Sequence, residues 1–276
     1  AVFKEGETEC FTTLNSSLYN EEKYLIQGIP ATTLGLVFNT EDEIFSNVNM
    51  RKALAISIDK TSLSGKIDSD LQVARGIIPP ALMVHGRSYR ELVSDKSLGT
   101  YDETQAIECY EAAKKEANFA SLGELKILVN AETVNSSYLH ELTRKWQDIF
   151  GFYIGIEDVS EREFNSRIAQ GDYKIALYPL KGDTAMGSAI IEKLGKSGVC
   201  GELAGYDAVV EAMHSSSTVD HLVDSYSNAE KLIIDSYSFV PIFYKNSYLI
   251  ANKANEDIIY DPFTESIDYR IAQNYD

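Results

Sequence analysis

Cysteine and histidine are both scarce in this sequence of 276 residues. The three cysteines, Cys10, Cys109 and Cys200, lie far apart and form no C-x-x-C pair. That spacing supports neither a zinc site nor a redox motif, and it allows at most one disulfide. The two nearest histidines, His214 and His221, are separated by serines that we expect to end a helix between them. A metal site needs matched spacing and further ligands, so we expect no metal and no cofactor.

Long apolar runs and an excess of positive charge are also absent. No apolar stretch approaches the roughly 18 residues of a membrane-spanning helix, so none is expected. The net charge of -17 argues against a nucleic-acid partner, because phosphate binding needs clustered Lys and Arg. It also disfavours an anionic membrane surface, and we interpret the charge as a contribution to solubility. The sequence does not open like a signal peptide, which is typical of a mature, processed or cut chain.

Sequence motifs of catalysis are missing as well. The chain contains no G-x-x-x-x-G-K-[ST], G-x-G-x-x-G, G-x-S-x-G or H-E-x-x-H. With 42 acidic residues, pairs of carboxylates occur by chance throughout the sequence, so they do not indicate a glycosidase. No nucleophile–base pair is marked, and we expect a protein that is not an enzyme.

The middle of the chain has the most regular pattern. Residues 125–130, 152–158 and 173–180 have the alternating apolar character of strands, and helices are expected at about 134–149 and 160–171. Strand–helix–strand–helix–strand implies βαβ units with right-handed crossovers and largely parallel pairing. The sequence therefore predicts an α/β fold with a mixed, largely parallel sheet.

Further elements are expected on both sides of this region. The predicted strands cover residues 31–39 and 239–253, and the predicted helices cover residues 45–60, 101–117, 203–214 and 219–237. Caps are expected at the starts of three helices, from Ser46 or Asn47, from Asp102 and from Ser160. Residues 1–30 have the character of a connecting segment, and Pro79-Pro80 predicts an ordered loop or extended arm within 72–100. Cys109 falls on the apolar stripe of its predicted helix, which indicates a core position.

Six short motifs follow one another in a recognisable order between residues 34 and 245. They are "LVFN" with "FSNVNMRKALAISIDK", then "ARGIIPP", "YDETQAIECYEAA", "LTRKWQDIFGFYIGIE", "YDAVVEAM" and "FVPIFY". Their order resembles the C-terminal half of family 5 extracellular solute-binding proteins, the oligopeptide- and dipeptide-binding components of ABC transporters. The resemblance implies a periplasmic-binding-protein type II-like lobe, in a family whose chains have two lobes around a cleft.

The resemblance also implies how the chain is divided and what it does. Residues 1–33 would be a connecting segment that resembles part of the first lobe, 34–245 the second lobe, and 246–276 a return segment toward the first lobe. The expected function is non-catalytic: the protein binds a peptide or peptide-like solute between the lobes and delivers it to an ABC permease. A monomer is expected, outside the cell, as a membrane-anchored lipoprotein or in the periplasm. The alternatives are a sensor or scaffold of the same fold without transport, and a non-peptide solute such as a nickel complex or a sugar.

Ligands of parallel α/β sheets lie beyond the carboxyl ends of the strands. Those ends are the loops 130–136 and 178–184 here. In peptide-binding members of the family the second loop carries a Trp and, three residues later, an Asp that pairs with the peptide α-amino group. The resemblance implies that Leu180 occupies the Trp position and Asp183 the Asp position. Leu180 departs from the family pattern and removes an aromatic wall.

Three neighbours complete the expected site. Tyr178 belongs to the same loop, and Lys181 would favour an anionic group or pair with Asp183. Asn135 falls where peptide binders place a polar cleft side chain. The alternative for Asp183 is a cap on the following helix, and we weigh the two roles equally. Arg51 is given no ligand role, because the resemblance places its helix at the base of the lobe, and we expect it to extend to the surface or to pair there.

Overall fold

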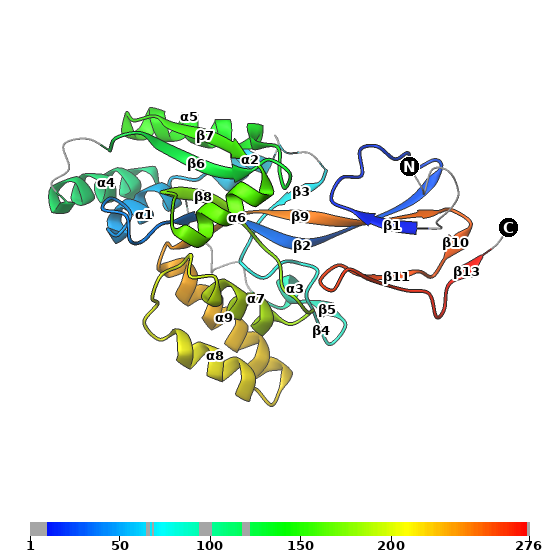
Figure 1. Ribbon diagram of the computed structural model, residues 1–276. Coiled ribbons are helices and arrows are strands. Elements are labelled where there is room, and N and C mark those ends of the chain that lie inside the picture. Colours follow the sequence, from blue (N-terminus) through cyan, green and yellow to red (C-terminus); the bar gives the residue numbers. More distant parts are fainter. Residues whose placement is uncertain (1–9, 65–66, 68, 94–100, 118–121, 275–276) are drawn as a thin grey trace.

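The computed structural model describes residues 10–64, 67, 69–93, 101–117 and 122–274. In this part of the chain, a mixed sheet of seven strands has helices on both faces (Figure 1). The strand order is β1-β9-β2-β8-β6-β7, and β3 also pairs with β9. These strands are β1 Cys10–Thr13, β2 Tyr24–Phe38, β3 Leu71–Val73, β6 Leu125–Asn130, β7 Ile154–Val159, β8 Ile175–Leu180 and β9 Phe239–Asn252.

The remaining elements are the helices and three two-stranded sheets. The helices are α1 Val48–Ile56, α2 Lys60–Ser64, α3 Tyr89–Leu92, α4 Glu103–Ala117, α5 Leu139–Phe150, α6 Glu161–Gln170, α7 Gly187–Lys196, α8 Tyr206–Ser215 and α9 Val219–Asp235, with a 3-10 turn, η2, at Ser136–Tyr138. These sheets are β4 Met83–Val84 with β5 Arg87–Ser88, β10 Asn255–Glu256 with β13 Gln273–Asn274, and β11 Ile259–Asp261 with β12 Ser266–Asp268.

The predicted βαβ units are present in the β6–α5–β7–α6–β8 region. Strand β6 lies between β7 and β8 and pairs in parallel with both. The α/β fold class is confirmed, but parallel pairing is confined to these three strands. Strands β1, β2, β3 and β9 pair antiparallel with their neighbours, and β2 is antiparallel to β8. Apolar alternation indicates that a segment is a strand and does not specify its partner, which is why the sequence could not reveal this half of the sheet.

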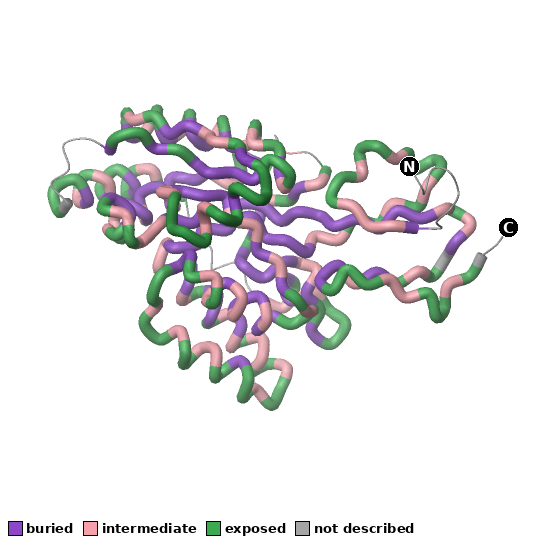
Figure 2. Tube along the Cα trace, in the orientation of Figure 1, coloured by how far each residue is buried: buried purple, intermediate pink, exposed green. Residues whose placement is uncertain are grey.

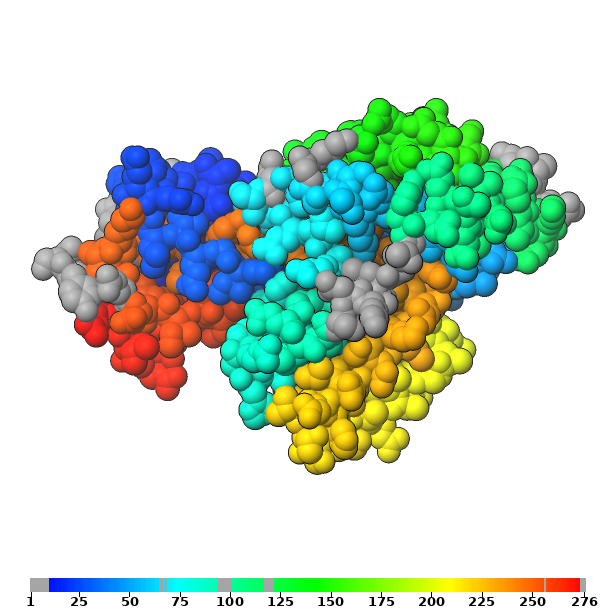
Figure 3. Space-filling model, turned by 180° about the vertical axis from the view of Figure 1, so that it is seen from behind, coloured from blue at the N-terminus to red at the C-terminus, as the bar shows by residue number. Residues whose placement is uncertain are grey.

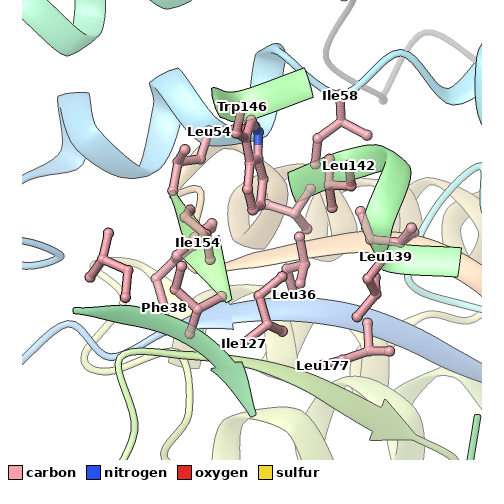
Figure 4. Packing of buried hydrophobic residues seen from close by; sticks show 14 of the residues in the cluster. Leu36, Phe38, Leu54, Ile58, Ile127, Leu139, Leu142, Trp146, Ile154 and Leu177 are labelled. Atoms are coloured by element: carbon pink, nitrogen blue, oxygen red, sulfur yellow. The ribbon is translucent and has the colours of Figure 1, made fainter. Parts of the chain in front are cut away.

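Each face of the sheet buries its own apolar core. Helices α1, α4 and α5 cover one face, where Leu36, Phe38, Ile127 and Trp146 are fully buried together (Figure 4). Helices α6 to α9 cover the other face. The core beneath them includes Val37, Phe164, Ala176, Ile190, Ile233 and Phe239. Neighbouring residues of one strand alternate between the two cores, as the pleat requires.

Strands β2 and β9 continue beyond the helices into a narrow projection (Figures 1 and 2). We call residues 10–30 and 246–274 the arm, and the other described residues the body. The arm contains β1, the first half of β2, the second half of β9 and the two-stranded sheets β10–β13 and β11–β12. A register shift between Pro30 and Thr32 marks where the long strands pass from arm to body, and a second shift lies between Leu34 and Gly35 within the body. The arm also stands apart from the body when the molecule is viewed from behind (Figure 3).

Local helix signals in the sequence are confirmed where the structure describes them. The Asn47 side chain caps α1 by accepting from the amides of Asn49 and Met50, and Asp102 accepts from the amide of Gln105 at 2.8 Å. Ser160 accepts from the amide of Glu163 at 3.3 Å. Such caps satisfy amides that have no partner within the helix.

Arg51 corrects one expectation. Its side chain is only 8% exposed and does not reach the surface. The guanidinium donates to the carbonyls of Phe45 at 2.6 Å and Ser46 at 3.0 Å, and Nη2 donates to the carbonyl of Ser236 at 3.1 Å. Arg51 therefore joins the segment before α1 to the segment after α9, as a part of the scaffold. Cys109 is buried as predicted, and all three cysteines are free.

Candidate functional site

A polar pocket of about 500 Å³ lies at the carboxyl end of β6, where the arm meets the body. Residues 131–136, which follow β6, form one wall, and Asp158 near the end of β7 adjoins them. The arm contributes Leu14, Asn15 and Ser17, and the central strand β9 contributes Lys245. The pocket therefore occupies the edge of the sheet at which ligands of parallel α/β sheets bind. We call it the cleft.

The carboxylates of the cleft accept hydrogen bonds from neighbouring protein groups. Asp70 accepts from the hydroxyl of Tyr248 at 2.6 Å, and Asp158 accepts from the hydroxyl of Ser136 at 2.7 Å. Glu132 accepts from the backbone amide of residue 161 at 3.1 Å. These donors hold the acidic side chains against the wall of the cleft.

Asn135 lines the cleft as the resemblance implied. It is exposed, and its Oδ1 accepts from the amide of Ser137 at 3.0 Å, which caps the 3-10 turn η2. The Nδ2 group of the same amide makes no hydrogen bond to the described residues, so it remains a donor available to a bound molecule.

Lys245 is the basic side chain that lines this cleft among the described residues, and it is only 8% exposed. It lies two residues after Phe243 on β9, so both side chains leave the same face of the strand. The Phe243 ring packs against Tyr138, another residue of the cleft wall, with ring centroids 6.5 Å apart. Burial lowers the pKa of Lys245, while the nearby charge of Asp70 acts in the opposite direction. No hydrogen bond or ion pair joins its ammonium to any residue that the structure describes.

The second expected loop lies beside the cleft and does not line it. Asp183 is exposed and pairs with Lys193 on α7, with Oδ1 2.5 Å from Nζ. It does not cap α7, whose N-cap position is Met186 without a side-chain cap bond. Lys181 forms an ion pair with Glu265 in the turn between β11 and β12, and so connects the body to the arm.

Leu180 and Tyr178 point into the body. Leu180 is 0% exposed in the core beneath α7, so its side chain has no surface to offer a solute, and this expectation is corrected. Its fellow residue on β8, Tyr178, is half-buried against the same core, and burial raises its pKa. Both face the helices because alternate residues of β8 share one side. Of the five expected site residues, the cleft therefore includes Asn135 alone.

Lys245 and Asp70 were missed by sequence reasoning. Lys245 is the charged residue of β9, "FVPIFYKNSYLIAN", whose other residues are apolar or uncharged. A lone charge in a central strand is a signal for a buried functional group, because burying an unpaired charge is costly. Asp70 carries no comparable signal, since its place depends on Tyr248, which is distant in the sequence.

Other site types find no support in the part of the chain that is described. No group of three His, Cys, Asp or Glu side chains there could hold a metal ion. His214, which the sequence analysis considered for a metal pair, lies with Nε2 2.8 Å from Oε1 of Glu192. The search for membrane spans, over the same residues, finds no helix with the length and apolar character needed to cross a bilayer.

Comparisons with known proteins agree with this geometry. Residues 9–199 match the family described as "Bacterial extracellular solute-binding proteins, family 5 Middle". The chain is 20% identical over 262 residues to the probable D,D-dipeptide-binding periplasmic protein DdpA of Escherichia coli, covering 91% of this chain and 48% of that protein. It is 22% identical over 228 residues to the periplasmic oligopeptide-binding protein OppA of Haemophilus influenzae, covering 79% of this chain and 41% of that protein.

The fold is also that of solved structures. The substrate-binding domain of an oligopeptide ABC transporter from Bacillus anthracis superposes with a TM-score of 0.74 at 15% identity, over 100% of this chain and 56% of that one. A dipeptide-binding protein from Pseudoalteromonas, in complex with Met-Leu, gives a TM-score of 0.72 at 17% identity, over 99% and 55%. The chain spans about half the length of the curated relatives it matches. It belongs to family 5 of the bacterial extracellular solute-binding proteins.

Proposed function

We propose that the chain is the second lobe of a solute-binding protein that carries a peptide or peptide-like solute to an ABC permease. The observation that carries this proposal is the polar cleft at the carboxyl ends of β6 and β7, in a chain that belongs to family 5. A cleft of about 500 Å³ has the size of a small-molecule or short-peptide site. No catalytic group is needed for this role, because binding and release are the whole of the activity.

The arm supports the proposed division of the chain at residues 33 and 246. Its strands pair with one another and extend away from the helices, as expected of segments that lead toward a first lobe. Closure of two lobes over a solute would then be a hinge motion, with the long strands as the connection. The proposed location is outside the cell, in the periplasm or on a lipid anchor, and the proposed assembly is a monomer that contacts the permease.

Asn135 and Asp183 are the proposed solute contacts that remain on accessible surface. Asn135 would use its free amide donor, and Asp183 would exchange Lys193 for an ammonium group of the solute. Exposed ion pairs are weak, so the Asp183–Lys193 pair does not oppose such an exchange strongly. Lys181 would contribute through the position of the arm that it holds.

The proposal is tested by thermal melting of the whole natural protein that contains these residues, with a pool of random tripeptides to pentapeptides. A ligand that binds only the folded state raises the melting temperature, and the rise grows with the logarithm of the ligand concentration once this exceeds the Kd. A rise with the pool, and a smaller rise for Asp183→Ala, is the expected result. If peptides, sugars and metal ions all leave the melting temperature unchanged, the proposed transport role is overturned in favour of a sensor or scaffold of the same fold.

The isolated chain provides a second check. If the cleft is completed by another lobe, residues 1–276 alone should bind the pool far more weakly than the whole protein, because part of the contact surface is then missing. Micromolar binding by the isolated chain would contradict the proposed two-lobe site.

A further inference from the structure

Lys245 is an unusual residue for the centre of a sheet. It pairs with Thr32 of β2 on one side and with Leu71 of β3 on the other, so its backbone is fixed by two neighbouring strands. Its side chain is more than nine-tenths buried, yet it lines the cleft and lies on the same strand face as Phe243. Partial removal of an ammonium from water is costly unless an acceptor replaces the lost hydrogen bonds.

The neighbouring carboxylates do not satisfy Lys245 by direct contact. Asp70 accepts from Tyr248, Asp158 accepts from Ser136, and neither lies in an ion pair with the lysine. The charge of Asp70 acts on Lys245 only through space. The cleft is therefore left with one strong donor group whose acceptor is absent from the described residues.

From this arrangement we infer that Lys245 binds a carboxylate group of the solute. The inference rests on the proposed function and names the solute class: acids, with the carboxylate at a peptide C-terminus or on an acidic side chain. An ammonium–carboxylate hydrogen bond is about twice as strong as a neutral one, and the partial desolvation of Lys245 strengthens it. The acidic walls of the cleft repel an anion elsewhere, so they restrict the carboxylate to the position beside Lys245.

Three peptide libraries distinguish the two sources of the carboxylate. The first has free C-termini and lacks Asp and Glu, the second is the same library with amidated C-termini, and the third is amidated but contains Asp and Glu. Binding to the whole natural protein is measured by titration calorimetry. A C-terminal contact gives binding of the first library at least about 10-fold tighter than the second, and a side-chain contact gives the same preference for the third.

The variant Lys245→Met keeps the length of the side chain and removes the charge. We expect it to lose about 10- to 100-fold in affinity for the preferred library and to bind the amidated library without acidic residues unchanged. Lys231→Met is the matched control, because Lys231 pairs with Asp235 on exposed α9 and lies outside the cleft. It should change neither affinity.

Stability gives a readout that separates this role from a structural one. Because burial holds the pKa of Lys245 below its usual value, the unfolded chain binds the proton more tightly than the folded chain does. Lys245→Met should therefore melt at the same or a higher temperature than the wild type, and its advantage should shrink as the pH rises toward the usual lysine pKa. A lower melting temperature with unchanged library preference would show that Lys245 only offsets the charge of Asp70, and would overturn the inference.

The measurements distinguish a failure of the proposed function from a failure of the Lys245–carboxylate contact. If all three libraries bind equally and Lys245→Met changes none of them, the proposed function stands and the carboxylate contact is wrong. A preference for acids that survives in Lys245→Met also overturns the contact, because another group then binds the carboxylate. If no library binds, the proposed function fails and the contact fails with it.

Discussion

The body and the arm share two strands but are stabilised in different ways. In the body, β2 and β9 lie between two apolar cores, and helices cover both faces. In the arm, the same strands have only small clusters: Cys10, Leu249, Ala251 and Tyr260 on one side, and Tyr248 with Ile250 on the other. Burial of apolar surface is the main stabilising term in folding, so most of the stability must lie in the body. The arm keeps its shape mainly through the backbone hydrogen bonds between its strands and through its attachment to the body.

The largest loss of stability is expected when a large side chain is removed from the core of the body. Trp146 is fully buried among the apolar residues of Figure 4. Its Nε1 donates to the hydroxyl of Ser57 at 2.9 Å. Trp146→Ala should lower the free energy of unfolding by about 3–5 kcal/mol, from the cavity and the lost hydrogen bond. Urea unfolding measures this change. Tyr153→Ala, at a 68% exposed aromatic residue, is the matched control and should change stability by less than about 1 kcal/mol.

The body also depends on one buried polar network. Glu230 on α9 is 1% exposed, accepts from the amide of Ile78 at 2.7 Å and from the hydroxyl of Tyr89 at 3.0 Å, and forms an ion pair with Arg90. Glu230→Ala should cost about 3 kcal/mol, because it leaves Arg90 buried without its partner. Asp235→Ala, which breaks an exposed pair on the same helix, should cost less than about 1 kcal/mol. Equal losses in the two variants would contradict the buried role of the network.

A smaller effect is expected from the same kind of change in the arm. Leu249→Ala removes a fully buried leucine of the small arm cluster, and Leu142→Ala removes one from the body core. We expect a loss of about 2 kcal/mol or less for Leu249→Ala, since the thin arm can collapse around the space, and a larger loss for Leu142→Ala. Hydrogen exchange should locate the first change in residues 24–30 and 246–252. Equal global losses would show that arm and body unfold as one unit.

The smallest effect concerns the link between the two regions. Glu265→Gln removes the acidic partner of Lys181 and leaves a side chain of the same size. The global stability should change by less than about 1 kcal/mol, because this pair is largely exposed. Faster amide exchange in β11 and β12, with unchanged exchange in β6, would show that the pair holds the arm. Unchanged exchange in both places would mean that Phe263, which packs into the second core, anchors the turn by itself.

Sequence reasoning succeeded where the physical signal is local. Asn47, Asp102 and Ser160 satisfy amides within three residues, so their caps could be predicted from the letters alone. The apolar alternation of residues 125–130 likewise predicted β6 with its correct bounds. The family motifs extended this success from single elements to the fold, since their order covers both faces of the sheet.

Sequence reasoning failed where the place of a strand or side chain depends on residues that are distant in the sequence. Residues 24–30 have polar and apolar residues without a clear period, and they form a strand because β9 lies beside them. The direction of the Leu180 side chain was missed because the family pattern names a position in a loop and does not specify which face of β8 it occupies. Lys245 lies in the cleft beside Asp70 and Tyr138, which are distant in the sequence, and no local pattern contains that arrangement.

The pairing of β2 with β9 has a consequence for the order in which the molecule is made. Tyr24 lies opposite Asn252, so β2 leaves the ribosome long before its main partner exists. Its apolar residues 31–38 are all buried in the finished protein, and until β9 is synthesised they are exposed in a nascent chain that tends to aggregate. The β6–α5–β7 unit needs only neighbouring residues and should be protected first. Pulse-labelled hydrogen exchange during refolding should therefore find β6 amides protected before those of β2, and the reverse order would contradict this sequence of events.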